Sequence, residues 1–231
     1  MDNVIVSTLY NRPGFTRQLL EALSRCDGVG EYTYWAFVEP GPPEVIEHLE
    51  WARDAGFFRA HHWFFNEQRM GIRLNMQQAL TKVFAQRDRV IVLEDDCIPG
   101  PDSLRYFEWA LDEYERDATV FSVTAYHRPG TKPMTPDQLA AHSERHWADA
   151  RRRCFFHPWG WATWKDRWQK VGRALPGVSW DKHILRHVQD NGLYEIYPAV
   201  PRVKNVGRQK HRNGWAWAGN WELPEIRQWH E

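Results

Sequence analysis

The 231-residue sequence is poor in several features that would otherwise define its class. It has three cysteines, Cys26, Cys97 and Cys154, which are too few and too far apart for a disulfide framework or a zinc-binding pattern. No apolar run approaches the about 18 residues that a membrane-spanning helix needs. The first residues also lack the basic and apolar regions of a signal peptide. These absences predict a cytoplasmic protein with reduced cysteines and no membrane span.

A glycine-rich phosphate loop is missing as well. The segment that follows the first expected strand reads TLYNRPG, at residues 8–14, and is not such a loop. This argues against a nucleotidyltransferase, which would normally carry one, although that class stays an alternative. Repeats and low-complexity tracts are also absent, so a single domain over residues 1–231 is expected.

The sequence has no net charge of either sign, because 30 Lys and Arg balance 30 Asp and Glu. The two halves differ, however: residues 1–115 carry 11 basic and 19 acidic side chains, and residues 116–231 carry 19 and 11. A basic half is typical of proteins that face an anion such as a diphosphate or a nucleic acid. The alternative is that the two halves neutralise each other across one core.

Tryptophan is present in excess, with 14 residues. Its flat face suits stacking on sugars or bases, although most tryptophans in globular proteins belong to the core. Trp161, Trp164 and Trp168 follow one another at helical spacing, which predicts a helix with Trp164 and Trp168 in the core. Trp159 and Gly160 precede this expected helix and are better placed to contact a ligand.

The first hundred residues alternate strand and helix signals. Strands are expected at residues 3–9, 33–39, 59–65 and 89–94, and helices at residues 11–28, 42–56 and 71–86. This order predicts an α/β fold with a Rossmann-like, mostly parallel sheet flanked by helices. Further on, helices at residues 101–115 and 180–190 and a strand at 118–126 are expected. Residues 127–150 are rich in proline and predict a mobile loop.

The fourth expected strand runs directly into Glu94, Asp95 and Asp96. In an open α/β sheet, ligands bind at the carboxyl ends of the strands. Three adjacent carboxylates raise one another's pKa unless a cation neutralises them. Because Mg²⁺ and Mn²⁺ prefer oxygen ligands and also bind phosphate oxygens, the triplet predicts a metal that binds a diphosphate. The alternative, an acidic helix N-terminus, is disfavoured by the intervening Pro99 and Gly100.

Four stretches, in this order, carry a family resemblance. VSTLYNRPGFTRQLLEAL looks like the first strand, nucleotide loop and helix of family 2-type glycosyltransferases. VIVLEDDCIPGPDSLRYFEWAL resembles the metal-binding segment of GT-A enzymes, above all the N-acetylglucosaminyltransferase I family and its small bacterial and phage relatives. HPWGWATWKDRW and SWDKHILRH…YPAVPRVKNVG are similar to two later blocks of these proteins. The resemblance implies one GT-A domain, in which residues 1–100 bind a nucleotide sugar and residues 101–231 face the acceptor.

The resemblance also implies roles for individual side chains. Asp96 would bind Mn²⁺ or Mg²⁺, with His211 as a second ligand. Asp181 would be the base that takes the acceptor proton in an inverting transfer, with His183 as the fallback. Mammalian members carry Trp-Asp-Asp-Trp where this sequence keeps one Asp after Trp180, so a role of Asp181 as a helix N-cap stays open. Trp159, Gly160 and Trp180 would lie on the acceptor or sugar side. The residues expected to contact the nucleotide sugar are Thr8, Tyr10, Asn11, Arg12, Glu39, Arg73, Glu94, Asp95, Arg208 and Lys210. Arg69 is a second candidate for the phosphate contact assigned to Arg73.

These observations predict a metal-dependent transferase that moves a sugar from a nucleotide diphosphate, expected to be a UDP-sugar, to an acceptor hydroxyl. The acceptor is left open between a glycan and a 5-hydroxymethyl pyrimidine in phage DNA. The basic run ARRRC at residues 150–154 and the tryptophans would suit a phosphate backbone and a flipped base. A non-catalytic sugar-binding protein is a further alternative, but such a protein has no need of the acidic triplet.

Overall fold

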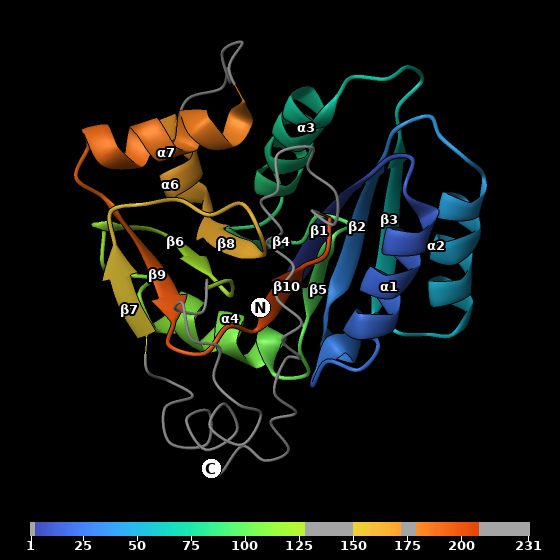
Figure 1. Ribbon diagram of the computed structural model, residues 1–231, viewed down its shortest axis with the longest axis horizontal. Coiled ribbons are helices and arrows are strands. Elements are labelled where there is room, and N and C mark those ends of the chain that lie inside the picture. The colour runs from blue at the N-terminus through green and yellow to red at the C-terminus, as the bar shows by residue number, and fades with distance from the viewer. Residues whose placement is uncertain (1–2, 128–149, 172–178, 208–231) are drawn as a thin grey trace, which may run out of the picture.

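The computed structural model describes residues 3–127, 150–171 and 179–207. Its centre is a sheet of eight strands in the order β3-β2-β1-β4-β8-β6-β9-β7, with helices on both faces (Figure 1). A second, two-stranded sheet pairs β5 (Cys97–Pro99) with β10 (Val203–Asn205). None of the helices in these ranges is both long and apolar enough to span a bilayer.

The first part of the chain folds as the sequence predicts. Parallel strands β3, β2, β1 and β4 lie side by side, and each is joined to the next along the chain by a helix. The elements are β1 (Val4–Leu9), α1 (Pro13–Leu23), the short 3-10 turn η1 (Val29–Glu31), β2 (Thr33–Val38), α2 (Glu44–Asp54), β3 (Ala60–Phe65), α3 (Ile72–Phe84) and β4 (Arg89–Val92). The parallel pairing places the carboxyl ends of β1, β2 and β4 at one edge of the sheet.

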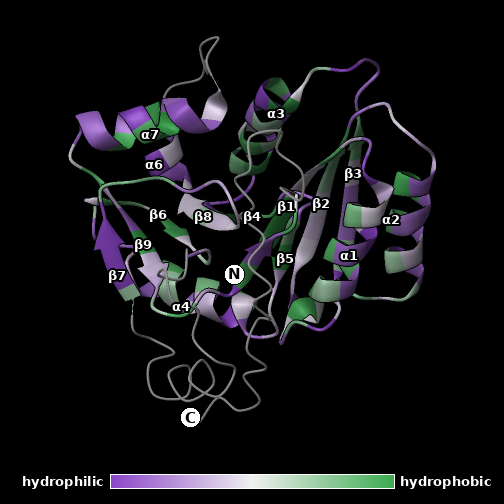
Figure 2. Ribbon diagram, in the orientation of Figure 1, coloured by the Kyte–Doolittle hydropathy of each residue, from purple (hydrophilic) through white to green (hydrophobic). Residues whose placement is uncertain are grey.

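The rest of the sheet mixes directions. β8 (Trp161–Trp164) runs antiparallel to both β4 and β6 (Val120–Thr124). β9 (Tyr194–Pro198) is parallel to β6, and the edge strand β7 (Ala150–Arg153), which is hydrophilic in Figure 2, is antiparallel to β9. The helices of this part are α4 (Ser103–Glu113), α6 (Lys165–Val171) and α7 (Trp180–Asp190).

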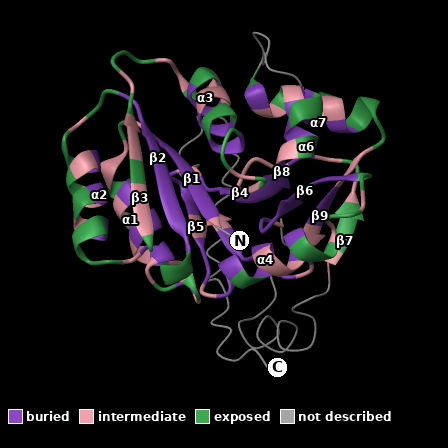
Figure 3. Ribbon diagram, turned by 180° about the vertical axis from the view of Figure 1, so that it is seen from behind, coloured by how far each residue is buried: buried purple, intermediate pink, exposed green. Residues whose placement is uncertain are grey.

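Two apolar clusters hold the layers together, one on each face of the sheet. Alternation along the strands assigns the side chains: Ile5 and Tyr34 pack under α1, α2 and α4, whereas Val6 and Trp35 pack under α3, α6 and α7. Figure 3 shows the central strands in the colour of buried residues. Burial on both faces explains why the sequences of β1 and β2 are mostly apolar and do not alternate with exposed polar residues.

The helix that the tryptophan spacing predicts is wrong in its first part. Trp161 and Trp164 lie in β8, and only Trp168 lies in helix α6. All four residues of β8 are buried, and in so short an apolar run the period cannot distinguish a strand from a helix. The prediction that Trp164 and Trp168 belong to the core is confirmed, since they are 3% and 7% exposed. The predicted loop at residues 127–150 lies outside the described residues apart from its two ends.

Candidate active site

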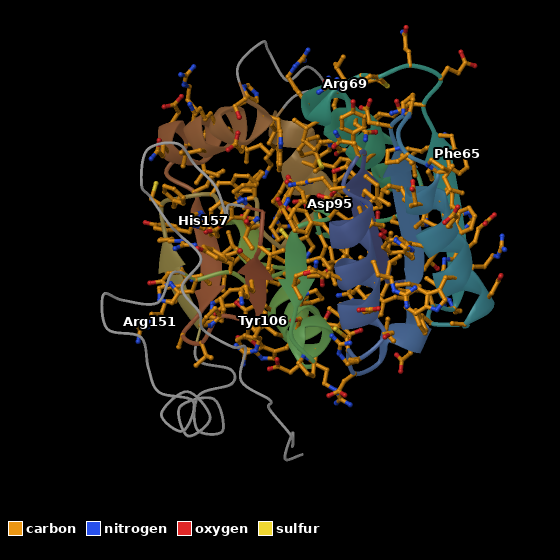
Figure 4. All side chains as sticks on the ribbon, turned by 45° about the vertical axis from the view of Figure 1, so that its right-hand side comes forward. Phe65, Arg69, Asp95, Tyr106, Arg151 and His157 are labelled. Carbon is orange, nitrogen blue, oxygen red and sulfur yellow. The ribbon has the colours of Figure 1, made fainter. Side chains whose placement is uncertain are left out.

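The strand-end residues that the sequence singled out lie around one cavity of about 490 Å³. It is formed where β1, β2 and β4 end and where α3 begins. Figure 4 shows Asp95 near the middle of the molecule and Arg69 by the start of α3. The predicted donor-side residues in its wall are Thr8, Tyr10, Asn11, Arg12, Glu39, Arg69, Glu94, Asp95 and Asp96. Arg73 is not among the wall residues, so Arg69 is the better placed of the two arginines.

Glu39, at the end of β2, lies in the wall of this cavity, which we call the donor cavity after the role predicted for its residues. Its Oε2 accepts a hydrogen bond from the backbone N–H of Met70 at 2.7 Å, which fixes the segment that carries Arg69. The guanidinium of Arg69 lies 4.8 Å from the ring centroid of Tyr10. Oε1 of Glu39 is buried and finds no hydrogen-bond partner within the described ranges. A buried acceptor of this kind suits a ligand N–H group, such as one on a nucleobase.

Arg12, the residue just before α1, neutralises part of the acid cluster, the name used below for Glu94, Asp95 and Asp96. Its Nε donates to Asp95 Oδ2 at 3.1 Å, a second nitrogen pairs with Asp95 Oδ1, and its third donates to Asp96 Oδ2 at 2.9 Å. The Arg12 side chain is 40% exposed, whereas the Asp95 side chain is 4% exposed. The sequence did not indicate this ion pair, because 83 residues separate Arg12 from Asp95.

One guanidinium does not satisfy three carboxylates. Burial raises the pKa of Glu94 to about 8, and the charges of Asp96 and Asp95 add to the shift. Burial also raises the pKa of Asp95 to about 6, although Arg12 acts in the opposite direction. Burial therefore disfavours the charged forms of these carboxylates, and a further cation in the site would favour them.

The donor set fits a divalent cation of the Mg²⁺ or Mn²⁺ type. Such ions are commonly held by one or two carboxylates and complete their coordination with water and phosphate oxygens. Asp96 offers a carboxylate that faces the cavity and is itself only 8% exposed. No group of three His, Cys, Asp or Glu in the described ranges surrounds a metal position, so a phosphate-bearing ligand would have to complete it. His211, Arg208 and Lys210 lie outside these ranges.

A second cavity, also of about 490 Å³, adjoins the first. Arg12 and Asp96 lie in the walls of both, so the two cavities meet at the acid cluster. Asp181 and Trp159, both predicted for the acceptor side, line this acceptor cavity. The remaining wall residues are Phe155, Phe156, His157, Pro158, Lys182, Leu185, Asn205 and Gly207.

Two residues predicted for the acceptor side, and the fallback base, have other surroundings. Trp180 is 4% exposed and packs against Phe156 and Trp161, so it belongs to the core and not to the cavity wall. Gly160 has φ +69°, and a β-carbon there would lie 2.8 Å from a methyl of Val203, so this position requires glycine for packing reasons. His183, the fallback base, is absent from the cavity wall, and its Nε2 lies 3.5 Å from the Val171 carbonyl oxygen.

Asp181 is not the N-cap of α7. The helix begins at Trp180 with Ser179 in the capping position, which places Asp181 in the first turn. Its carboxylate accepts a hydrogen bond from the Ser179 hydroxyl and is close enough to Glu94 to raise the pKa of that group. The capping alternative is therefore wrong, and the carboxylate is available to the acceptor cavity.

Glu195 hydrogen-bonds to the backbone of His157, a wall residue of the acceptor cavity. This role was not predicted from the sequence. Glu195 is fully buried in β9, opposite Arg153 of β7, and its Oε1 accepts from Arg153 Nε at 2.9 Å. Its Oε2 accepts from the backbone N–H of His157 at 2.6 Å. Behind this wall Tyr126 packs edge-on against Trp159. A lone charged residue in the strand sequence YEIYP was the available signal.

Glu195 should make stability pH-dependent. Burial raises its pKa to about 7 from an ordinary 4.5, against the opposing effect of Arg153. The folded state thus binds this proton more tightly than the unfolded chain does. The contribution of Glu195 to the free energy of unfolding therefore declines as the pH rises from about 4.5 to about 7. We expect Glu195→Gln to gain stability relative to wild type between about pH 5 and about pH 8 in urea unfolding. The exposed Glu113→Gln is the control, and parallel pH profiles of Glu195→Gln and wild type would contradict the expectation.

Comparison with known proteins identifies this combination of fold and site. A family model described as the GNT-I family matches residues 69–220. The chain belongs to the GNT-I family. Within it, an alpha-1,3-mannosyl-glycoprotein 2-beta-N-acetylglucosaminyltransferase of Arabidopsis thaliana is 30% identical over 164 residues. The match covers 71% of this chain and 29% of that relative.

Solved structures agree with the GNT-I assignment at the level of the fold. TarS of S. aureus has a TM-score of 0.61 and 12% identity, over 88% of this chain and 36% of TarS. The mannosyltransferase PcManGT of Pyrobaculum calidifontis, solved with GDP-Man and Mn²⁺, has a TM-score of 0.56 and 16% identity, over 87% of this chain and 57% of PcManGT. The predicted GT-A fold and family resemblance are thus confirmed.

Proposed function

We propose that this GNT-I family protein is a glycosyltransferase that moves a sugar from a nucleotide diphosphate to an acceptor hydroxyl. The observation that carries the proposal is the meeting of two cavities at Arg12 and Asp96. A transferase needs a donor site and an acceptor site that share the point of bond exchange, whereas a sugar-binding protein needs only one. The single GT-A domain expected from the sequence is part of this proposal.

The donor cavity supports a nucleotide sugar, and we propose a UDP-sugar. The nucleobase would lie toward Glu39, where the buried Oε1 can accept a hydrogen bond from a base N–H. The diphosphate would lie between Arg69 and the acid cluster. Asp96 would hold the divalent cation, which when bound neutralises charge on the departing diphosphate. TarS has been solved with UDP, which supports this nucleotide, whereas PcManGT has been solved with GDP-Man, so both nucleotides belong in the test below.

The acceptor cavity supports an inverting transfer with Asp181 as the base. Its carboxylate lies in the wall of the cavity that adjoins Asp96, where an acceptor hydroxyl would face the donor. By taking the hydroxyl proton, Asp181 would make the oxygen nucleophilic as the sugar–phosphate bond breaks. Trp159 would present part of an aromatic face to the acceptor.

A glycan hydroxyl is the acceptor that the cavity wall favours. Within the described residues, Arg12 and Lys182 balance Asp96 and Asp181 there, which suits a neutral ligand. A 5-hydroxymethyl pyrimidine in DNA is the second candidate, favoured by the exposed Arg151 and Arg152 on β7. A DNA acceptor predicts affinity that falls steeply with salt, whereas a neutral glycan predicts almost no change.

A panel of nucleotide sugars, with and without Mn²⁺, tests the donor. We expect a UDP-sugar together with Mn²⁺ to raise Tm by about 5 °C or more at a hundredfold excess over Kd. Without Mn²⁺, or with GDP- and ADP-sugars, the shift should be much smaller. Slow Mn²⁺-dependent hydrolysis of the same UDP-sugar is the second readout. No response to any UDP-sugar would remove the donor assignment.

A further inference from the structure

The segment of residues 203–207 closes over the acid cluster from the C-terminal side. Pairing of β10 with β5 sets Asn205 opposite Cys97, the neighbour of Asp96. Asn205 Nδ2 donates to Asp96 Oδ1 at 3.0 Å, and the backbone N–H of Val206 donates to the Asp96 carbonyl at 2.9 Å. The functional carboxylate is thereby connected to a residue 109 positions away in the chain.

Both halves of the Asn205 amide are in use. While Nδ2 donates to Asp96, Oδ1 accepts a hydrogen bond from the backbone N–H of Gly207 at 3.1 Å. The carboxylate requires a donor and the Gly207 N–H requires an acceptor, so only this orientation of the amide satisfies both. An aspartate at position 205 would place a carboxylate against a carboxylate.

Gly207 lies against the other oxygen of Asp96. A β-carbon at position 207 would collide with Oδ2 and lie 2.8 Å from Cγ of Asp96. Only a glycine lets the backbone approach this closely while Oδ2 still reaches Arg12 at 2.9 Å. Oδ1 is therefore engaged by Asn205, whereas Oδ2 pairs with Arg12, a residue that lies in the wall of both cavities.

This segment has its own anchor, which does not depend on Asn205. Just before β10, Arg202 donates from Nε to Asp102 at 2.7 Å, with both side chains at most 2% exposed. Its backbone N–H donates to the Ala125 carbonyl, and its carbonyl accepts from the N–H of Gly100. Loss of the Asn205 side chain should thus leave β10 in place and free the Asp96 carboxylate together with the Gly207 N–H.

We propose that Asn205 is a positioning residue that fixes the Asp96 carboxylate with Oδ2 directed at the metal and diphosphate, while Gly207 leaves room for it. The proposal rests on the proposed function, in which Asp96 holds the divalent cation. Groups that orient a metal-ligating carboxylate typically change metal affinity by about 10- to 100-fold when they are removed. The same loss is expected from Asn205→Ala.

The test measures Mn²⁺ binding in the presence of UDP by electron paramagnetic resonance of free Mn²⁺. Asn205→Ala is expected to weaken Mn²⁺ affinity about 10- to 100-fold, and Gly207→Ala to do so through the other oxygen. Metal-free UDP affinity should stay within about twofold of wild type, because no donor-cavity contact is removed. Asn191→Ala, at the exposed end of α7, is the matched control.

The outcomes separate this inference from the function on which it rests. If Asp96→Ala keeps wild-type Mn²⁺ affinity in the UDP complex, the proposed metal site is wrong. If Asp96→Ala loses it but Asn205→Ala and Gly207→Ala do not, only the positioning role is overturned. A merely structural role for Asn205 would lower Tm and metal-free UDP affinity together and leave the folded protein's Mn²⁺ affinity unchanged, which also overturns it.

Discussion

Replacing Asp96 by asparagine is expected to lower sugar transfer by about 10³-fold, because the site loses the charge that holds the cation against the departing diphosphate. The side chain keeps its size, and the relieved repulsion with Glu94 offsets the lost pairing with Arg12, so the variant should stay close to wild type in stability. The measurement is turnover of a UDP-sugar at saturating Mn²⁺, together with Tm. Loss of activity with an unchanged or higher Tm separates a chemical role from a packing role.

Asp112→Asn is the control for this prediction, since Asp112 is an acid on α4 that is 64% exposed and pairs with Arg89 at the surface. It should retain wild-type turnover. If Asp96→Asn still turned over with a normal Mn²⁺ requirement, the ion would have to be held elsewhere. A sugar-binding protein, by contrast, would keep its sugar affinity in Asp96→Asn and show no turnover in either form.

Replacing Asp181 by asparagine is expected to reduce kcat by about 10²- to 10⁴-fold, the range typical of a lost general base. The amide of the variant would still offer Ser179 a hydrogen-bonding partner but could not accept the acceptor's proton. Donor binding should be unaffected, since Asp181 lines the acceptor cavity and not the donor cavity. Pre-steady-state turnover and UDP affinity, measured side by side, give the two quantities.

Asp190→Asn, at the exposed far end of α7, is the matched control for Asp181→Asn. The pH dependence adds an independent check, because the limb of the kcat profile that belongs to the base should disappear with the carboxylate. Retention of activity in Asp181→Asn, combined with its loss in His183→Gln, would transfer the role to His183. The ring of His183 lies outside the cavity wall, which is why we do not expect that result.

The parallel half of the sheet could be predicted because its signals are local. Each of β1, β2 and β4 is a mostly apolar run followed by polar residues, and the strand-end rule then places Glu39 and Asp96 at one edge. The role of the acids as a metal site stays a prediction, which the position of the Asp96 carboxylate in the cavity wall supports.

The other half carries weaker signals. β10 has three residues and pairs with β5 across more than a hundred positions. A strand this short shows no periodic pattern of apolar residues from which it could be predicted. The contact of Asn205 with Asp96 and the ion pair of Arg12 with Asp95 arise in the same way, from pairings that only the folded chain creates. In β8, burial on both faces removed the alternation by which a strand is recognised.

The boundary between β4 and β8 divides the sheet into a parallel part and a mixed part, and the two cavities fall on either side of it with two wall residues in common. Under the proposed roles of the two cavities, substitutions at residues 155–159 would change the choice of acceptor and leave nucleotide binding unchanged. Such a division would allow evolution, or protein engineering, to change the acceptor specificity and to retain the donor specificity.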